Sequence, residues 1–271
     1  MCLFIFFSLF SFSSAAPPVI TVSIPPQAFF IHQIAGTHRF DVNVMIPNGQ
    51  SPAIYSPKPS QMIKMNRSDA FFIIGHPHFI FEVKHIYPFL ETKSIPVFSL
   101  YKQAAQVSYS LDPDDPHIWM SPILVIHILP FLSDFLDNFY PEDSLLFKEK
   151  TESLVKKIKT QQDSLAALFV KKGIKEFYVY HPSWGYFAQD FNLTQYAIES
   201  HGHDPGPEHL VNLVERIQHS ENKKIIIQKG FSTKAAEVLA KETGARIVEA
   251  DPLAYDWFES IQTMSTLLLE K

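Results

Sequence analysis

The sequence predicts an α/β fold of two lobes, each with a parallel sheet, joined by one long linking helix. Strand-like and helix-like segments alternate between residues 19 and 140, and they alternate again from residue 174 onward. Such alternation is typical of parallel sheets whose strands are connected by helices. Between the two regions lies a stretch with few helix breakers and apolar residues at roughly helical spacing. With 271 residues, of which 46% are hydrophobic, the chain can form a core in each lobe.

The N-terminal segment has the features of a signal peptide. Residues 3–12 are nearly all apolar and are followed by small residues. About ten apolar residues are too few to span a bilayer but suit a signal peptide. We therefore predict a signal peptide at residues 1–15 and a periplasmic mature protein without cysteine, since the single cysteine is Cys2. No Lys or Arg precedes the apolar run, which leaves open a start upstream of Met1, and the alternative is a buried N-terminal strand.

The N-terminal lobe is predicted to comprise residues 16–140. Its first strand is followed by Pro25 and Pro26, which open a helical pattern that closes at Gly36. Pro130 lies inside the last helical segment, so we expect a helix interrupted near that residue. The expected strands are 19–24, 40–46, 70–75 and 95–99, and the expected helices are 25–36, 60–66, 79–89 and 122–140.

The linking helix is predicted at residues 141–173 and the C-terminal lobe at 174–271. A periodic stretch of about thirty residues is much longer than the average helix of about a dozen. Its apolar repeat is too irregular for a coiled coil, so a rigid helix joining the lobes is the preferred interpretation. The expected strands of the second lobe are 175–180, 195–199, 224–228 and 246–249, and the expected helices are 182–191, 208–219, 232–243 and 255–269.

The charge distribution argues against nucleic acid as a partner. The formal net charge is −5, whereas a nucleic-acid-binding domain carries a stripe of Lys and Arg. The sequence also has no run of basic residues that would indicate a membrane-surface patch.

A proline-rich loop at residues 112–122 carries the first candidate site residue, His117. The prolines Pro113, Pro116 and Pro122 fix their own φ angles and bias the preceding residues toward extended backbone. We therefore expect a stiff loop, anchored by the apolar residues after the histidine. On its own, His117 is most simply a polar surface residue of a helix-entry loop.

Two further candidate residues follow predicted strands. His181 comes directly after the strand at 175–180, and Asp251 comes after the strand at 246–249. In open α/β sheets, ligands bind at the carboxyl ends of the strands. Two imidazoles and one carboxylate suit Zn²⁺, with Mn²⁺ or Fe²⁺ as alternatives. The simpler alternatives are an N-cap for Asp251 and a backbone-bonded histidine for His181.

Four motifs, in the same order along the chain, resemble those of bacterial ABC-transporter substrate-binding proteins for zinc and manganese (cluster A-I). Residues 115–122 (DPHIWMSP) resemble the family's Asp-Pro-His-x-Trp-Leu-Asp-Pro motif. Residues 181–187 (HPSWGYF) resemble its His-x-x-Phe-Gly-Tyr-Phe motif, and residues 250–253 (ADPL) resemble its Asp-Pro-Leu segment. Residues 49–59 (GQSPAIYSPKP) resemble its Gly-x-x-Pro-His-x-Tyr-Glu-Pro-x-Pro motif.

The resemblance implies a binding protein, not an enzyme, that holds one metal ion between its lobes. His117, His181 and Asp251 are the metal ligands that it carries over to this chain. Zinc is the expected ion, with manganese as the second choice. The expected partner is an ABC permease in the membrane, and the expected state is a monomer.

The chain departs from the family pattern at Ala53, where the family usually has a ligand histidine. A methyl group cannot coordinate a metal, and three protein ligands with water form an open site. His76 and His78, which follow the strand at 70–75, are candidates to replace it. The histidine-rich loop that many zinc-binding members carry before the Asp-Pro-His motif is absent here. The remaining close pair, His201 and His203, is interpreted as solvated loop residues.

Two alternatives remain open at this stage. An open His/His/Asp site also suits a metal-dependent hydrolase, although the sequence has no His-Glu-x-x-His helix and no clear general base. The other is a family member that has lost its metal through Ala53 and binds another partner.

Overall fold

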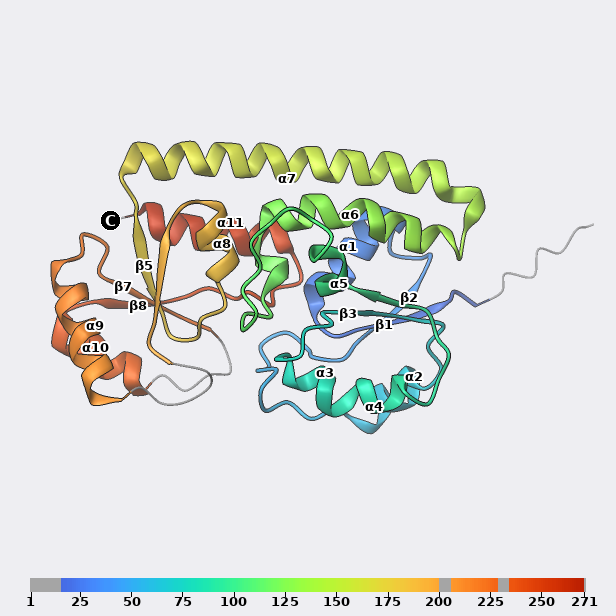
Figure 1. Cartoon of the computed structure of the whole chain (residues 1–271), viewed down its shortest axis with the longest axis horizontal. Helices are drawn as coiled ribbons and strands as arrows, with labels where there is room; N and C mark the ends of the chain where they lie inside the picture. Colours follow the sequence, from blue (N-terminus) through green and yellow to red (C-terminus); the bar gives the residue numbers. More distant parts are fainter. Residues whose placement is uncertain (1–15, 200–205, 229–233, 271) are drawn as a thin grey trace, which may run out of the picture.

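The computed structural model describes residues 16–199, 206–228 and 234–270. It has two α/β lobes lying side by side beneath one long helix, as the sequence predicts (Figure 1). The predicted signal peptide at residues 1–15 and the pair His201 and His203 lie outside the described residues. Among the described residues, no helix is both long and apolar enough to pass through a bilayer.

The first lobe is built on a parallel four-stranded sheet. Its strands lie in the order β2-β1-β3-β4, so the chain moves outward from β1 in one direction and then in the other. All residues of β3 are buried, because helices cover both faces of the sheet. The strands are β1 (Val19–Val22), β2 (Asp41–Val44), β3 (Ala70–Ile73) and β4 (Val97–Ser99).

The helices of the first lobe agree with the prediction except near two prolines and at residues 100–104, where Ser99 caps a short helix that was not predicted. Residues 79–89, expected as one helix, form two short ones, because Pro88 has no N–H to continue the hydrogen-bond ladder. The helices are α1 (Pro25–Ala35), α2 (Pro59–Met65), α3 (Ile80–His85), α4 (Tyr87–Leu90), α5 (Leu100–Ala104), the 3-10 turn η1 (Ile118–Met120) and α6 (Pro122–Asp137).

Helix α6 continues through Pro130, whereas the sequence predicts an interruption there. Leu124 and Ile128 on one side of the proline and Leu132 and Leu136 on the other are all buried. At spacings of four residues they form one buried apolar face of α6, and the helix packs against the neighbouring long helix. Burial of this face on both sides of the proline offsets the loss of one backbone hydrogen bond.

The long helix α7 (Ser144–Lys172) follows a 3-10 turn, η2 (Pro141–Asp143), and runs along both lobes (Figure 1). It has 29 residues. Buried residues recur along its inner face, from Phe147 near one end to Phe169 near the other. The helix ends at Gly173, whose φ of 66° is the left-handed conformation that glycine adopts readily.

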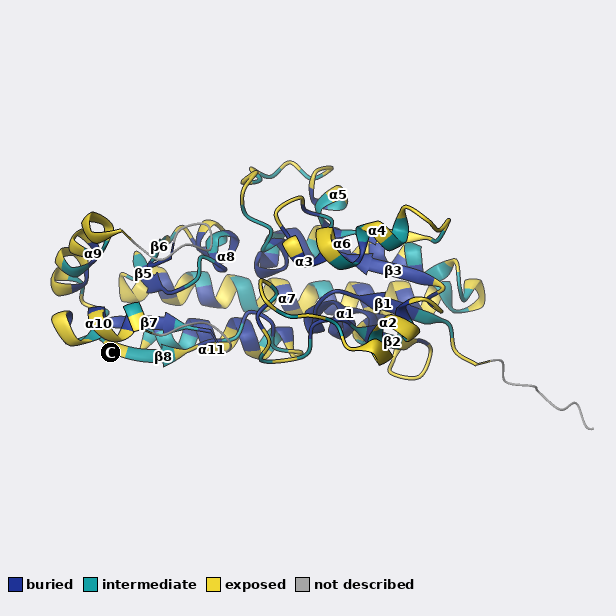
Figure 2. Ribbon diagram, turned by 90° about the horizontal axis from the view of Figure 1, so that it is seen from below, coloured by how far each residue is buried: buried dark blue, intermediate teal, exposed yellow. Residues whose placement is uncertain are grey.

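The second lobe repeats the topology of the first. Its parallel sheet has the strand order β6-β5-β7-β8, and Figure 2 shows β7 buried while the outer faces of its helices are exposed. The strands are β5 (Glu176–Val179), β6 (Thr194–Ala197), β7 (Lys224–Ile227) and β8 (Arg246–Glu249), and the helices are α8 (Gly185–Asp190), α9 (Pro207–His219), α10 (Lys234–Thr243) and α11 (Trp257–Leu269).

One hydrophobic cluster extends through both lobes. The indole of Trp119, in η1, donates to the carbonyl of Pro252 at 2.8 Å, and the indole of Trp257 donates to the carbonyl of Trp119 at 2.6 Å. Phe29 of α1 packs edge-on against Phe258 of α11. The two indole hydrogen bonds join the segment that carries His117 to α11 and to the residues before it, and the aromatic contact joins α1 to the same helix.

Candidate metal centre

A cavity of about 750 Å³ lies between the two lobes. His117 and His181 line it, and so do Ala53, His78 and Glu199. In the second sheet the strand order reverses between β5 and β7, and His181 follows the end of β5. The cavity therefore lies where α/β sheets bind their ligands, at the carboxyl ends of strands beside a topological switch point.

The loop before η1 holds His117 against a carboxylate. Asp115 Oδ1 accepts the backbone N–H of His117 at 2.8 Å and also lies 2.6 Å from its Nδ1. The side chains of His117 and Asp115 are only 12% and 14% exposed. The apolar residues that follow, Ile118 and Trp119, are buried, as expected for the anchor of this loop.

Helix α8 of the second lobe forms hydrogen bonds with the same loop and its flanking residues. Asp190 accepts hydrogen bonds from the hydroxyls of Tyr109 and Ser121 and from the backbone N–H of Ile123, at 2.6 to 2.8 Å. Burial raises the pKa of Asp190, and these hydrogen bonds to its carboxylate offset that rise only in part. The Tyr186 hydroxyl adds contacts to the backbone of the loop. His117 is thus fixed to the second lobe although its loop follows the first sheet in sequence.

His181 also lies against a carboxylate. Its Nδ1 is 2.6 Å from Glu199 Oε1, and Glu199 is itself only 9% exposed. Burial lowers the pKa of His181, and the hydrogen bond to Glu199 raises it in part. The carboxylate accepts the Nδ1 proton and so fixes the ring orientation, which is the usual arrangement behind a metal-binding histidine.

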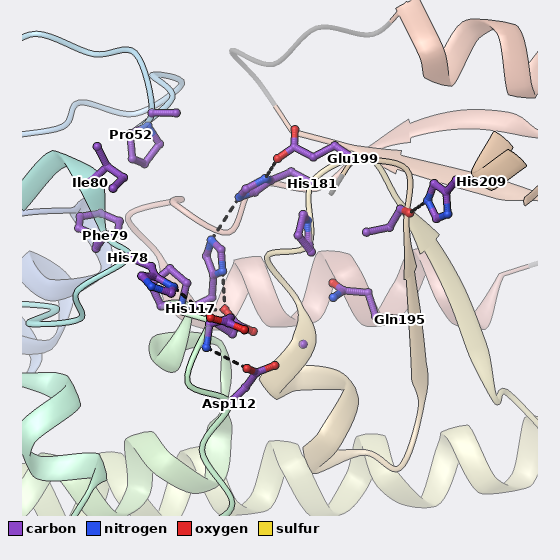
Figure 3. A pocket seen from close by; sticks show the side chains of 17 residues that line it. Pro52, His78, Phe79, Ile80, Asp112, His117, His181, Gln195, Glu199 and His209 are labelled. Carbon is purple, nitrogen blue, oxygen red and sulfur yellow. Dashed lines mark hydrogen bonds and ion pairs between the residues drawn. The ribbon is translucent and has the colours of Figure 1, made fainter. Parts of the chain in front are cut away.

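The two imidazoles face each other across the cavity (Figure 3). His117 Nε2 lies 3.4 Å from His181 Nε2, and the rings are nearly perpendicular, at 77°. Because each Nδ1 donates its proton to a carboxylate, a neutral ring presents a lone pair at Nε2. Two such lone pairs at this distance repel each other unless a proton or a cation lies between them. The pair therefore favours a cation.

Asp251 does not line this cavity. It follows β8 as predicted, but its Oδ1 accepts the backbone N–H of Leu253 at 2.9 Å. The alternative role as an N-cap is wrong, because Asp256 caps the last helix by accepting the N–H of Glu259. A ligand role for Asp251 stays a prediction. Within the described parts of the chain, no group of three His, Cys, Asp or Glu side chains is assembled as a metal site.

The two histidines after β3 have different surroundings. His76 is fully buried, and its Nδ1 accepts the backbone N–H of His78 at 3.1 Å. His78 faces the cavity, with its Nδ1 3.4 Å from Asp114 Oδ1.

Sequence reasoning missed the carboxylates that support the imidazoles. The spacing of Asp115 two residues before His117 was the visible signal, whereas Glu199 is 18 residues from its histidine.

Two α/β lobes under one long helix, with a carboxylate-backed histidine pair between them, define the class of two-lobed ligand-binding proteins. The sequence model of the family described as "Zinc-uptake complex component A periplasmic" matches residues 20–268, and the chain belongs to this family.

Individual relatives are consistent with this assignment. The chain is 30% identical to the zinc-binding protein AdcA of Streptococcus pyogenes serotype M6 over 141 residues, which are 51% of this chain and 27% of AdcA. It thus spans only about a quarter of that relative's length. A crystal structure of ZnuA superposes with a TM-score of 0.80 at 30% identity, covering 92% of this chain and 96% of ZnuA. A zinc-bound deletion mutant of ZnuA gives a TM-score of 0.81 at 29% identity, covering 92% and 95%.

Proposed function

We propose that this chain captures a zinc ion between its lobes and delivers it to the membrane permease of an ABC transporter. It would act outside the cytoplasm, in the periplasm, as a monomer. The family to which the chain belongs supports a role in metal uptake.

The spacing of the histidine pair carries the proposal. Imidazole nitrogens bind zinc at about 2.0–2.1 Å, so two of them on a tetrahedral ion lie roughly 3.3–3.4 Å apart. The Nε2 atoms of His117 and His181 are 3.4 Å apart. This spacing supports a zinc ion shared by the two rings with little rearrangement of their side chains.

Zinc is favoured over manganese by the chemistry of the donor atoms. Imidazole nitrogen suits zinc, whereas manganese prefers sites made of oxygen ligands. The zinc-binding names of AdcA and of the ZnuA mutant support the same choice. We propose His117, His181 and Asp251 as ligands, with Asp251 leaving its turn to reach the ion.

Metal titration tests the capture step. The purified protein should bind one zinc ion in competition with a chromogenic chelator, and His117→Ala or His181→Ala should weaken binding by at least about 100-fold, since even residues behind metal ligands contribute about 10–100-fold. Failure of the wild-type protein to bind stoichiometric zinc would overturn the proposal.

The delivery step needs a cellular measurement. Deleting the gene should impair growth in zinc-depleted medium, and wild-type protein should restore growth while His117→Ala should not. Full complementation by the His117→Ala variant would contradict delivery through this site. The hydrolase alternative has no support from the relatives, which are named as binding and uptake components.

A further inference from the structure

We infer that His78 supplies a third imidazole to the captured metal, from the loop after β3. This inference rests on the proposed zinc capture, and it concerns a residue outside the predicted set of His117, His181 and Asp251. It assigns the first lobe a ligand of its own, opposite the pair that the second lobe holds.

His78 shares two features with the histidines of the pair, although its carboxylate lies farther away, at 3.4 Å instead of 2.6 Å. All three line one cavity, and each has its Nδ1 turned to a carboxylate: His117 to Asp115, His181 to Glu199 and His78 to Asp114. A carboxylate at Nδ1 fixes the tautomer that leaves Nε2 as the metal-binding atom. Three imidazoles in one cavity, each with a carboxylate on its Nδ1 side, indicate a common role.

The loop that carries His78 has a fixed backbone and lies at the edge of the sheet where α/β proteins bind their ligands. In the first sheet the strand order reverses between β1 and β3, and the loop follows β3 at this switch point. Its start is fixed because Glu82 accepts the backbone N–H groups of Ile74 and Gly75 at 2.7 and 2.8 Å. Buried His76 then accepts the N–H of His78, so the backbone at His78 is well defined.

The side chain of His78, unlike its backbone, has room to move. It is 53% exposed, and its contact with Asp114 is long, at 3.4 Å. Apart from an edge contact with the ring of His76, rotation about its side-chain bonds meets little packing, and a bound cation can draw the ring toward the pair. The nearby cavity wall at Ala53 offers only a methyl group. Among the residues that line the first lobe's side of the cavity, His78 is the nitrogen donor.

A third imidazole also sharpens the choice of metal. Two nitrogens and an acidic group would accept several divalent ions, whereas three nitrogens favour zinc over manganese. His78 is thus assigned as a residue that determines metal specificity.

Three matched variants and one spectroscopic count test the inference. His78→Gln is compared with His117→Gln and with His209→Gln. His209 is at the opposite edge of the cavity, with its Nε2 committed to the Ala197 carbonyl at 2.9 Å (Figure 3). X-ray absorption of the zinc-loaded protein counts the imidazoles bound to the metal.

The wild-type spectrum should require three imidazoles and the His78→Gln spectrum two. His78→Gln should weaken zinc binding by about 100-fold, more than the 10-fold lower bound for groups behind a ligand, and His209→Gln should leave it unchanged. If the wild type binds zinc through two imidazoles and His78→Gln binds as tightly as His209→Gln, the inference fails while zinc capture by the pair stands. A wild-type protein that binds no zinc would overturn both. The wild-type count decides the question even if a variant fails to fold.

Discussion

Replacing Glu199 by glutamine tests how much the carboxylate behind His181 contributes to metal binding. Glutamine keeps the size of the side chain and an oxygen that can accept the Nδ1 proton, but it removes the negative charge. The charge lies 2.6 Å from the imidazole, and neither side chain is more than 22% exposed. Solvent therefore screens the interaction only weakly.

The expected loss follows from this geometry. Groups that support a metal-binding histidine contribute about 10–100-fold in affinity, which corresponds to about 1.4–2.7 kcal/mol. Because glutamine can still accept the hydrogen bond, we expect Glu199→Gln near the lower value and Glu199→Ala near the upper. Competition titration with a zinc chelator measures both.

Glu176→Gln is the matched control. Glu176 lies at the opposite end of β5 from His181 and accepts a hydrogen bond from the Tyr178 hydroxyl at 2.6 Å. This variant also loses a hydrogen-bonded carboxylate in the same lobe, but it should bind zinc as the wild type does. Equal affinities for Glu199→Gln and wild type, or an equal loss in the control, would refute the role assigned to the carboxylate.

Three further predictions concern neighbouring parts of the structure. A methyl group at Gly185 would lie 2.6 Å from Asp115 Oδ2, so Gly185→Ala should displace that carboxylate and weaken zinc binding about 10-fold; unchanged affinity would contradict it. If His78 is a ligand, the site already has three imidazoles, so Ala53→His should strengthen zinc binding less than about 10-fold. A gain of several orders of magnitude would instead indicate that the wild-type site has lost its metal. Burial raises the pKa of Glu82 from 4.5 to about 7. Between these pH values the folded chain retains a proton that the unfolded chain releases. The free energy of unfolding should therefore fall by about 3 kcal/mol as pH rises from 4.5 to 7. Urea unfolding across this range should show that fall in the wild type and not in Glu82→Gln, and identical pH profiles would rule it out.

The parallel sheets could be predicted because short apolar strands and helices alternate regularly along the sequence. The position of His181 followed directly from that pattern, since it is the second residue after β5. Pro130 misled the prediction because its backbone effect is local, whereas the apolar face that keeps α6 intact is completed by α7. Local sequence carries no information about such a partner.

The site could be predicted only in part for the same reason. The pairing of His181 with Glu199 joins the ends of two neighbouring strands, β5 and β6, and depends on their register. The contacts of Asp190 with Tyr109 and Ser121 join residues 81 and 69 positions apart. The sequence contains each of these residues, but only the fold shows that they meet.

These long-range contacts determine which lobe each histidine would move with. Read along the chain, His117 belongs to the first lobe and His181 to the second, so a movement of one lobe should separate them. In the structure, Asp190 and Tyr186 of α8 form hydrogen bonds with the loop of His117, and Trp119 donates a hydrogen bond to the segment before α11. The two imidazoles therefore belong to one hydrogen-bonded unit. A movement of the first sheet would leave His117 and His181 together and would shift the loop after β3 relative to them. That loop is therefore the part of the site that moves.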